Sequence, residues 1–341
     1  MEKKLAIVVL TWNDWKNTIE CLESIFNSSF KNFDIILVDN NSDEIHLKKI
    51  NEWSKNNIKV IDDEFDFNNN KKIDIIEVKD KFQVQEICKK KIYLIQNEKN
   101  LGLTAGLNIG YKFAISQKYD LLARIDCDFI ISKNYLKEML NLFDNDEKIV
   151  AASPKIKHAS LRHTVWWAGY KMNWSYLKFQ GTMNLKKKRI NDNPNIKGLV
   201  ETDSIAGCCS FYRPKLLELS GFGDEEFFFG PEDIELSYRL KKFGKLMANL
   251  NTYTLHKIAS SGEISGWSKR SYNETIGFLL LIKKTGNVLD KIIGYSYFII
   301  RLPFFIILMS LNIRKKENIL GFCLGCYDFF LKKSWKKNKK I

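Results

Sequence analysis

Two carboxylates, Asp126 and Asp128, flank Cys127 directly after an apolar run that predicts a buried strand at 119–126. Successive side chains of an extended chain point to opposite faces, so the two carboxylates share a face while Cys127 turns into the core. Hard oxygen ligands suit Mg²⁺ or Mn²⁺. Because ligands bind beyond the carboxyl ends of parallel strands, this position predicts a divalent-metal site that holds a diphosphate.

A second acid pair, Glu232 and Asp233, opens a predicted helix at 232–243, shortly after three phenylalanines at 227–229. Acids in the first turn of a helix are ordinary capping residues, which explains the pair without any chemistry. Apolar neighbours, however, raise the pKa of a carboxyl towards the value that a general base needs. The phenylalanines therefore favour a catalytic interpretation.

Polar residues also follow the first two predicted strands, where turn propensity explains Asn and Asp as well as ligand binding does. These residues are Thr11, Trp12, Asn13, Asp39 and Asn40. His256 ends another apolar run, and it is either a structural histidine or a further ligand of the metal.

Glycines recur every four residues around the start of a predicted helix at 104–118. The pattern contains Asn100, Gly102, Gly106, Asn108 and Gly110. It matches neither the dinucleotide-binding fingerprint nor a phosphate loop that ends in Lys-Ser/Thr. Close packing of the helix on its sheet explains the glycines as well as ligand binding does, but it leaves the two asparagines unexplained.

Alternating apolar strands and helices must position these residues. Buried strands are predicted at 5–11, 34–39, 92–96, 119–126 and 149–153, and helices at 17–26, 44–56, 104–118 and 134–143. This order predicts an α/β fold with a right-handed, doubly wound, mostly parallel, Rossmann-like sheet.

Later segments are less regular. We expect a surface excursion at 62–72 and a mobile loop region over the site at 154–200. A strand at 205–212, a helix at 232–243 and a final strand near His256 follow.

Charge is concentrated at the C-terminal end of the chain. The net charge is +14, and residues 282–341 hold thirteen Lys/Arg and three Asp/Glu, a net charge of +10. A nucleic-acid binder more often carries such charge on its folded body, so we expect attraction to an anionic membrane surface and no nucleic-acid partner. Seven cysteines without regular spacing favour a reducing compartment, and the short apolar run at 5–10 is no signal peptide.

The apolar segment 292–313 is long enough to span a bilayer of roughly 30 Å. Arg301 and Pro303 stand in its middle, where a charge is costly and a helix kinks. Positive clusters flank both ends, so a single span would place one of them outside. These features favour a helix in the cytoplasmic leaflet over a membrane span.

Taken together, the motifs resemble family 2 glycosyltransferases with the GT-A fold, most closely the rhamnosyltransferase-like enzymes of bacterial surface-polysaccharide assembly. The resemblance runs from about residue 5 to residue 262. Its motifs are Val9 to Asn13, Ile36 to Ser42, Asn100 to Gly110, Asp126 to Asp128, Gly221 to Phe229, Glu232 to Arg239, and His256.

The resemblance implies an inverting, metal-dependent transfer of a sugar from a nucleoside-diphosphate sugar to a glycan acceptor, lipid-linked or free. Asp39 would contact the base or ribose, and Asp233 would deprotonate the acceptor hydroxyl. Asp126, Asp128 and His256 would hold Mg²⁺ or Mn²⁺. The other donor-binding residues would be Thr11, Trp12, Asn13, Asn40, Asn100, Gly102, Gly106, Asn108 and Cys127.

The acceptor is expected to contact Gly207, Glu232, Trp166 and Trp167. Flat aromatic faces suit pyranose rings, although burial of both tryptophans in the core is an equally good explanation.

Three regions are expected: a nucleotide-binding half at 1–130, an acceptor-binding half at 131–262, and a helical, basic, membrane-associating region at 263–341. The enzyme would then work at the cytoplasmic face of the inner membrane as a peripheral or monotopic protein. A processive polysaccharide synthase is disfavoured because the Gln-x-x-Arg-Trp element and several membrane spans are missing from the sequence. A non-catalytic, membrane-associated sugar-binding protein would not need both Asp128 and Asp233.

Overall fold

The computed structural model describes residues 3–60, 72–78, 91–173, 178–181, 190–228, 230–257, 267–310 and 316–332. The predicted surface excursion at 62–72 lies almost entirely outside the described residues. The predicted domain boundary at 262/263 and the Lys-rich end at 333–341 also lie outside them.

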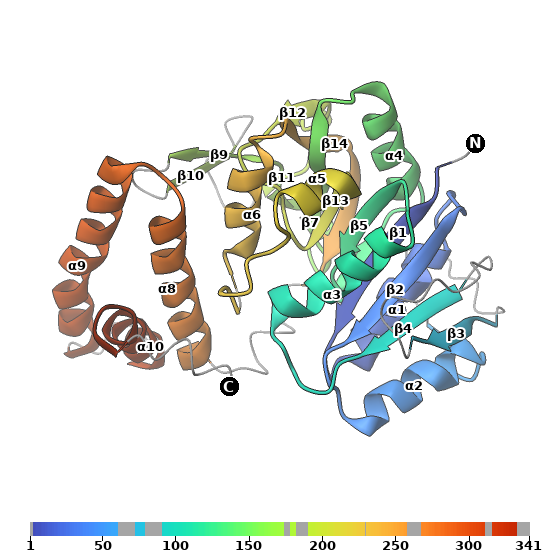
Figure 1. Cartoon of the computed structure of the whole chain (residues 1–341), viewed down its shortest axis with the longest axis horizontal. Helices are drawn as coiled ribbons and strands as arrows, with labels where there is room; N and C mark the ends of the chain where they lie inside the picture. The colour runs from blue at the N-terminus through green and yellow to red at the C-terminus, as the bar shows by residue number, and fades with distance from the viewer. Residues whose placement is uncertain are drawn as a thin grey trace.

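A twisted sheet forms the centre of the molecule (Figure 1). Its N-terminal half is parallel, in the order β5-β1-β2-β4-β3. The strands are β1 (Leu5–Thr11), β2 (Phe33–Asp39), β3 (Asp74–Glu77), β4 (Lys91–Gln96) and β5 (Leu121–Ile125). The predicted α/β class and the mostly parallel sheet are therefore confirmed.

Helices cover both faces of this sheet. An apolar core lies on each face of the sheet, and alternate residues of β1 point into the two cores. Ile7 and Val9 face one core, and Ala6 and Val8 face the other. The first core is covered by α1 (Trp15–Phe26), α2 (Glu44–Ser54) and α4 (Tyr135–Asn145). The second is covered by α3 (Leu103–Ser116), α5 (Pro214–Leu219) and α6 (Glu232–Leu240).

The second half of the sheet is mixed. The strand β13 (Cys209–Tyr212) lies antiparallel between β5 and β7 (Ile149–His158), and β14 (Lys245–His256) runs parallel to β7. β14 also pairs with β6 (Phe129–Ile131). The predicted strand at 205–212 is too long by four residues, because the chain turns at Ala206–Cys209 before β13 begins.

The loop region predicted at 154–200 is corrected, because much of it is paired. β7 extends to His158, and short strands follow it. They are β8 (Thr164–Trp167), β9 (Tyr170–Asn173), β10 (Lys178–Gly181), β11 (Ile190–Asn191) and β12 (Leu199–Glu201). β8 pairs with β7, β9 with β10 and β11 with β8, whereas β12 pairs with the distant β14.

Three helices form a separate group beside the sheet, in orange to red in Figure 1. They are α8 (Trp267–Lys284), α9 (Val288–Ser310) and α10 (Lys316–Tyr327), followed by a π-helical turn at Asp328–Lys332. The helical character predicted for the C-terminal region agrees with this. Within the described ranges, no helix has the length and apolar character needed to cross a bilayer.

Candidate active site

The Asp126–Asp128 motif occupies the short connection from β5 to β6. The strand ends at Ile125, one residue earlier than predicted, so the two acids lie on a turn. Cys127 is half-buried against the core, as expected, and burial raises the pKa of its thiol. The thiol is therefore uncharged at neutral pH.

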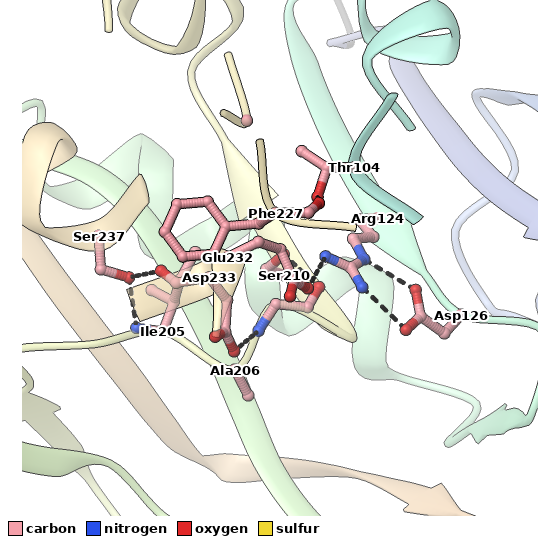
Figure 2. Close-up of polar contacts among 12 residues, drawn as sticks. Thr104, Arg124, Asp126, Ile205, Ala206, Ser210, Phe227, Glu232, Asp233 and Ser237 are labelled. Atoms are coloured by element: carbon pink, nitrogen blue, oxygen red, sulfur yellow. Dashed lines mark hydrogen bonds and ion pairs between the residues drawn. The ribbon is translucent and has the colours of Figure 1, made fainter. Parts of the chain in front are cut away.

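Arg124 organises the acids around it and was missed by the sequence analysis (Figure 2). Its Nε and Nη2 donate to both oxygens of Asp126, at 2.7 and 3.0 Å. Its Nη1 lies 3.5 Å from Oε1 of Glu232. A buried charge must be paired, so one arginine connects the two acid motifs. The signal in the sequence was a single charged residue inside the apolar strand 121–125.

Glu232 and Asp233 open α6 beside this arginine. Burial, together with the charge of Asp233, raises the pKa of Glu232 to about 7. Burial also raises the pKa of Asp233, against the opposing effect of the Gly207 N–H, which donates to its Oδ2 at 3.1 Å. The pKa of each carboxyl therefore lies above its ordinary value, which is the direction that a general base needs.

Gly207 lies against the side chains of Asp233 and Arg124. A Cβ at this position would lie 2.6 Å from Cβ of Asp233 and 2.9 Å from Nη1 of Arg124. The expected acceptor-side position of Gly207 is therefore next to the acid pair, where no larger residue fits without displacing its neighbours.

Asp128 and His256 come together from distant parts of the chain. Nε2 of His256 lies 3.3 Å from Oδ2 of Asp128, and the ring stacks on Phe129 with centroids 4.4 Å apart. Nδ1 of His256 is buried without a hydrogen-bond partner. The pairing of β14 with β6 produces this approach, because it sets His256 opposite Phe129.

A divalent metal fits Asp128 and His256, which offer one hard oxygen and one imidazole nitrogen. Both oxygens of Asp126 accept from Arg124, so in this structure Asp128 and His256 are the two side chains that face each other, and the role of Asp126 as a third ligand stays a prediction. Among the residues that the structure describes, no three His, Cys, Asp or Glu side chains cluster as a ready metal cage. Two protein ligands suffice for Mg²⁺, which usually keeps waters and substrate phosphates as its other ligands.

The tips of β1 and β2 lie side by side, since Thr11 pairs with Asp39. Asp39 is only 2% exposed; its Oδ2 accepts from Ser42 N, while Oδ1 is buried without a hydrogen-bond partner. An unpaired buried acceptor is costly, so this oxygen is suited to an N–H or O–H of a ligand.

The residues that follow β1 differ in their surroundings. Trp12 is exposed, whereas the hydroxyl of Thr11 is hydrogen-bonded to Thr18 and His46. Asn13 holds the next loop through Ser42 and Asp43.

Asn40, at the tip of β2, and Asn100 of the glycine-rich motif are hydrogen-bonded to each other and to the start of α3. Asn40 donates to Asn100 at 2.9 Å and to the carbonyl of Gly102, and its own oxygen accepts from Asn97 and Leu101. These contacts use the amide of Asn40 to hold the start of α3.

Asn108 in α3 similarly bonds to both backbone groups of Gly223. A Cβ at Gly102 would come within 2.7 Å of Phe228, and one at Gly106 within 2.7 Å of Leu10. The packing interpretation therefore accounts for these glycines, and the two asparagines gain a structural explanation.

The two tryptophans differ. Trp167 is 3% exposed in the core, so its expected stacking on an acceptor is corrected: it has no open face. Trp166 is half-buried, with its ring edge-on to His256 at 4.9 Å. Of the two, only Trp166 borders the site.

The segment 224–233, which ends in Glu232 and Asp233 and is called the acid-carrying segment, packs against α8 through the residues near its start. Lys284 forms ion pairs with Asp224 and Glu226, and Phe227 packs with Ile276 and Leu280. The C-terminal helices thus support the segment that leads to Glu232 and Asp233.

Comparison with known proteins decides the family. Residues 6–74 and 68–218 match the model of "Glycosyl transferase family 2", which is more than half of the chain. The chain belongs to glycosyl transferase family 2. The predicted family and the predicted enzyme class are confirmed, so the protein is a glycosyltransferase.

Two relatives support this glycosyltransferase assignment over part of the chain. One is a hyaluronan synthase from Pasteurella multocida, 25% identical over 185 residues, which covers 47% of this chain and 18% of that protein. The other is an uncharacterized glycosyltransferase from Haemophilus influenzae, 24% identical over 147 residues, which covers 43% of this chain and 35% of that protein. The matches span about a third or less of these relatives.

Solved glycosyltransferases share the fold over almost the whole chain. GalNAc-T7 with UDP, GalNAc and Mn²⁺ has a TM-score of 0.60 at 14% identity, covering 99% of this chain and 58% of that one. The mannosyltransferase PcManGT from Pyrobaculum calidifontis, with GDP-Man and Mn²⁺, has a TM-score of 0.56 at 10% identity, covering 98% and 88%. At these identities the likeness shows the fold, and it confirms the GT-A type.

Replacing Gly207 with alanine is expected to lower kcat by about 100-fold, since an added Cβ must displace Asp233 or Arg124 and misplacement near 1 Å costs about that much. Steady-state kinetics with a parallel melting curve checks this. A folded variant with the native rate would show that the position of Asp233 is unimportant.

The pH profile of kcat should reflect the raised pKa values of the acid pair. A base works only when deprotonated, and burial raises the pKa of both carboxyls, so activity should fall as the pH drops, starting above the ordinary carboxyl range. Glu232 and Asp233 interact, so this acid limb belongs to the pair. Glu232→Gln should change the position of the limb, and a profile that is flat down to pH 4.5 would contradict the assignment.

Proposed function

We propose that this glycosyltransferase is a metal-dependent inverting enzyme. It transfers a sugar from a nucleoside-diphosphate sugar to a hydroxyl of a glycan acceptor, lipid-linked or free, in bacterial surface-polysaccharide or glycoconjugate assembly. The observation that carries the proposal is the link that Arg124 makes between Asp126 and Glu232. It joins the motif that contains the Asp128–His256 pair to the buried Glu232–Asp233 pair. The first suits a diphosphate and its metal, and the second suits proton removal.

Asp233 acts as the general base. It takes the proton of the acceptor hydroxyl as that oxygen attacks the anomeric carbon, and the bond from this carbon to the nucleoside diphosphate breaks on the opposite face. The N–H of Gly207 donates to Oδ2 of Asp233 and holds the carboxylate in place at the start of α6. Glu232 lies 3.5 Å from Nη1 of Arg124, and burial raises the pKa of Asp233 towards the value that a base needs.

The donor would lie over the tips of β1, β2 and β5. Asp39 offers its unpaired Oδ1 to the base or ribose, and Arg124 orients Asp126 towards the donor. Mg²⁺ or Mn²⁺, when bound at Asp128 and His256, would offset charge on the leaving diphosphate. TarS from S. aureus, solved with UDP-GlcNAc, shares the fold with a TM-score of 0.54 at 15% identity, covering 96% of this chain and 80% of that one. Together with the UDP and GDP-Man of the other structures, it supports a nucleotide-sugar donor.

The test is the configuration of the product. Incubation with UDP-, GDP- and dTDP-sugars and a panel of glycan acceptors, followed by NMR of the new linkage, should give the anomer opposite to that of the donor. A product with the donor's configuration would contradict a single displacement by Asp233.

A further inference from the structure

The outward face of α9 is apolar, although an exposed helix face is normally polar. Along Val288–Ser310 the exposed large apolar side chains recur at helical spacing. Ile292, Ile299, Ile300, Phe304 and Ile307 are each between 54% and 71% exposed. This set is called the α9 stripe.

The inward face of α9 already has partners. Gly294 lies against Ile282 of α8, and Phe298 stacks on Phe322 of α10 with ring centroids 6.0 Å apart. Figure 1 shows α9 on the side of this helical group that lies away from the sheet. The packing of α9 on α8 and α10 therefore uses its inward face and leaves the α9 stripe exposed.

The basic sequence of the C-terminal region favours an anionic occupant for the α9 stripe. Residues 282–341 carry thirteen Lys/Arg against three acids, a net charge of +10. Lys283 is exposed and Lys291 is half-buried, at the end of the helical group where the α9 stripe begins. A second copy of the chain would bring two such positive segments together, whereas an anionic lipid surface offers opposite charge and an apolar interior.

We propose that the α9 stripe docks on an anionic lipid bilayer, with α9 lying at the boundary between headgroups and acyl chains. Arg301 and Pro303, which disfavour a span, are compatible with a helix in this plane. The bilayer would be the cytoplasmic face of the inner membrane, where the protein would be peripheral or monotopic.

Docking of the α9 stripe on a bilayer would also affect the candidate active site, because α8 contacts the segment that leads to Glu232 and Asp233. Gly277 of α8 packs so closely on Gly230 that a Cβ would meet its carbonyl, and Lys284 pairs with Asp224 and Glu226. A bilayer held by α9 would therefore fix the orientation of the acid-carrying segment. This consequence rests on the proposed function, whereas lipid binding itself does not.

Flotation of the full chain with vesicles tests the proposal. The wild type should float with vesicles of 70% phosphatidylcholine and 30% phosphatidylglycerol, and 0.5 M salt or pure phosphatidylcholine should weaken this by about tenfold. The variant Ile299→Asp/Ile300→Asp should lose at least about tenfold in binding. The control Ile45→Asp changes an equally exposed residue on α2 and should bind like the wild type.

The charge-reversal variant Lys283→Glu/Lys291→Glu, which leaves the α9 stripe unchanged, should also bind anionic vesicles more weakly. Melting curves and light scattering accompany each variant. The proposal is overturned if the wild type stays with the pellet, or if the folded stripe variant floats like the wild type. It is equally overturned if the wild type is a stripe-dependent dimer that ignores vesicles.

Discussion

Asp233→Asn is expected to lower kcat by about 10²- to 10⁴-fold while the affinity for the nucleotide sugar stays unchanged, because a general base acts only in the chemical step. The side chain stands at the first turn of α6, held by Gly207 N–H, and its pKa is raised by burial. An asparagine keeps the shape and that contact but cannot accept the proton. Single-turnover kinetics and calorimetric donor titration separate the two effects.

Glu232→Gln is the matched control for this prediction. Glu232 faces Arg124 rather than Gly207, so its loss should change the pH profile more than the maximal rate. If Asp233→Asn transfers sugar at a near-native rate while Glu232→Gln is inactive, the base is Glu232 and the proposed roles are exchanged.

Asp128→Asn is expected to weaken donor binding and to lower donor turnover by more than about 100-fold, and EDTA should abolish turnover of the wild type. Loss of a residue that only orients a metal ligand costs roughly 10- to 100-fold, so loss of a direct ligand should cost more. Asp128 and His256 approach to 3.3 Å in the structure, as two ligands of one ion would. Turnover and donor affinity are measured over a Mn²⁺ titration.

The chain contains its own control for this substitution. Asp144 belongs to a second Asp-x-Asp triplet at the end of α4, where it pairs with Lys3 on the surface. Asp144→Asn should leave the metal response unchanged. Full activity of the wild type in chelator would rule out the metal at Asp128 and His256.

Local sequence was enough to predict the parallel half of the fold except for β3, where no strand was predicted. β1 was predicted with the observed bounds, and α1 to α4 differ from their predictions by about two residues at either end. These elements are long, strongly patterned and connected along the chain, so hydrophobic periodicity carries most of the information. The short strands β8 to β12 have too few residues for a pattern, and β12 in addition pairs with the distant strand β14.

The candidate site divides in the same way. The acids of the site were predicted from their motifs. The contact of Arg124 with Glu232 was not, because the two residues are 108 positions apart in the sequence. Likewise, only the pairing of β6 with β14 brings His256 to Asp128. Trp167 shows the opposite problem: its type suggested sugar binding, and only tertiary packing revealed that it is buried.

A thermal-shift screen of UDP-, GDP- and dTDP-sugars, with and without Mn²⁺, tests the central claim most directly. One nucleotide class should raise the Tm of the wild type only when Mn²⁺ is present. Asp128→Asn should lose this response, whereas Asp233→Asn should keep it. A Tm unchanged by every nucleotide sugar, or raised equally in EDTA and in Asp128→Asn, would contradict a metal-dependent glycosyltransferase site built on Asp128 and His256.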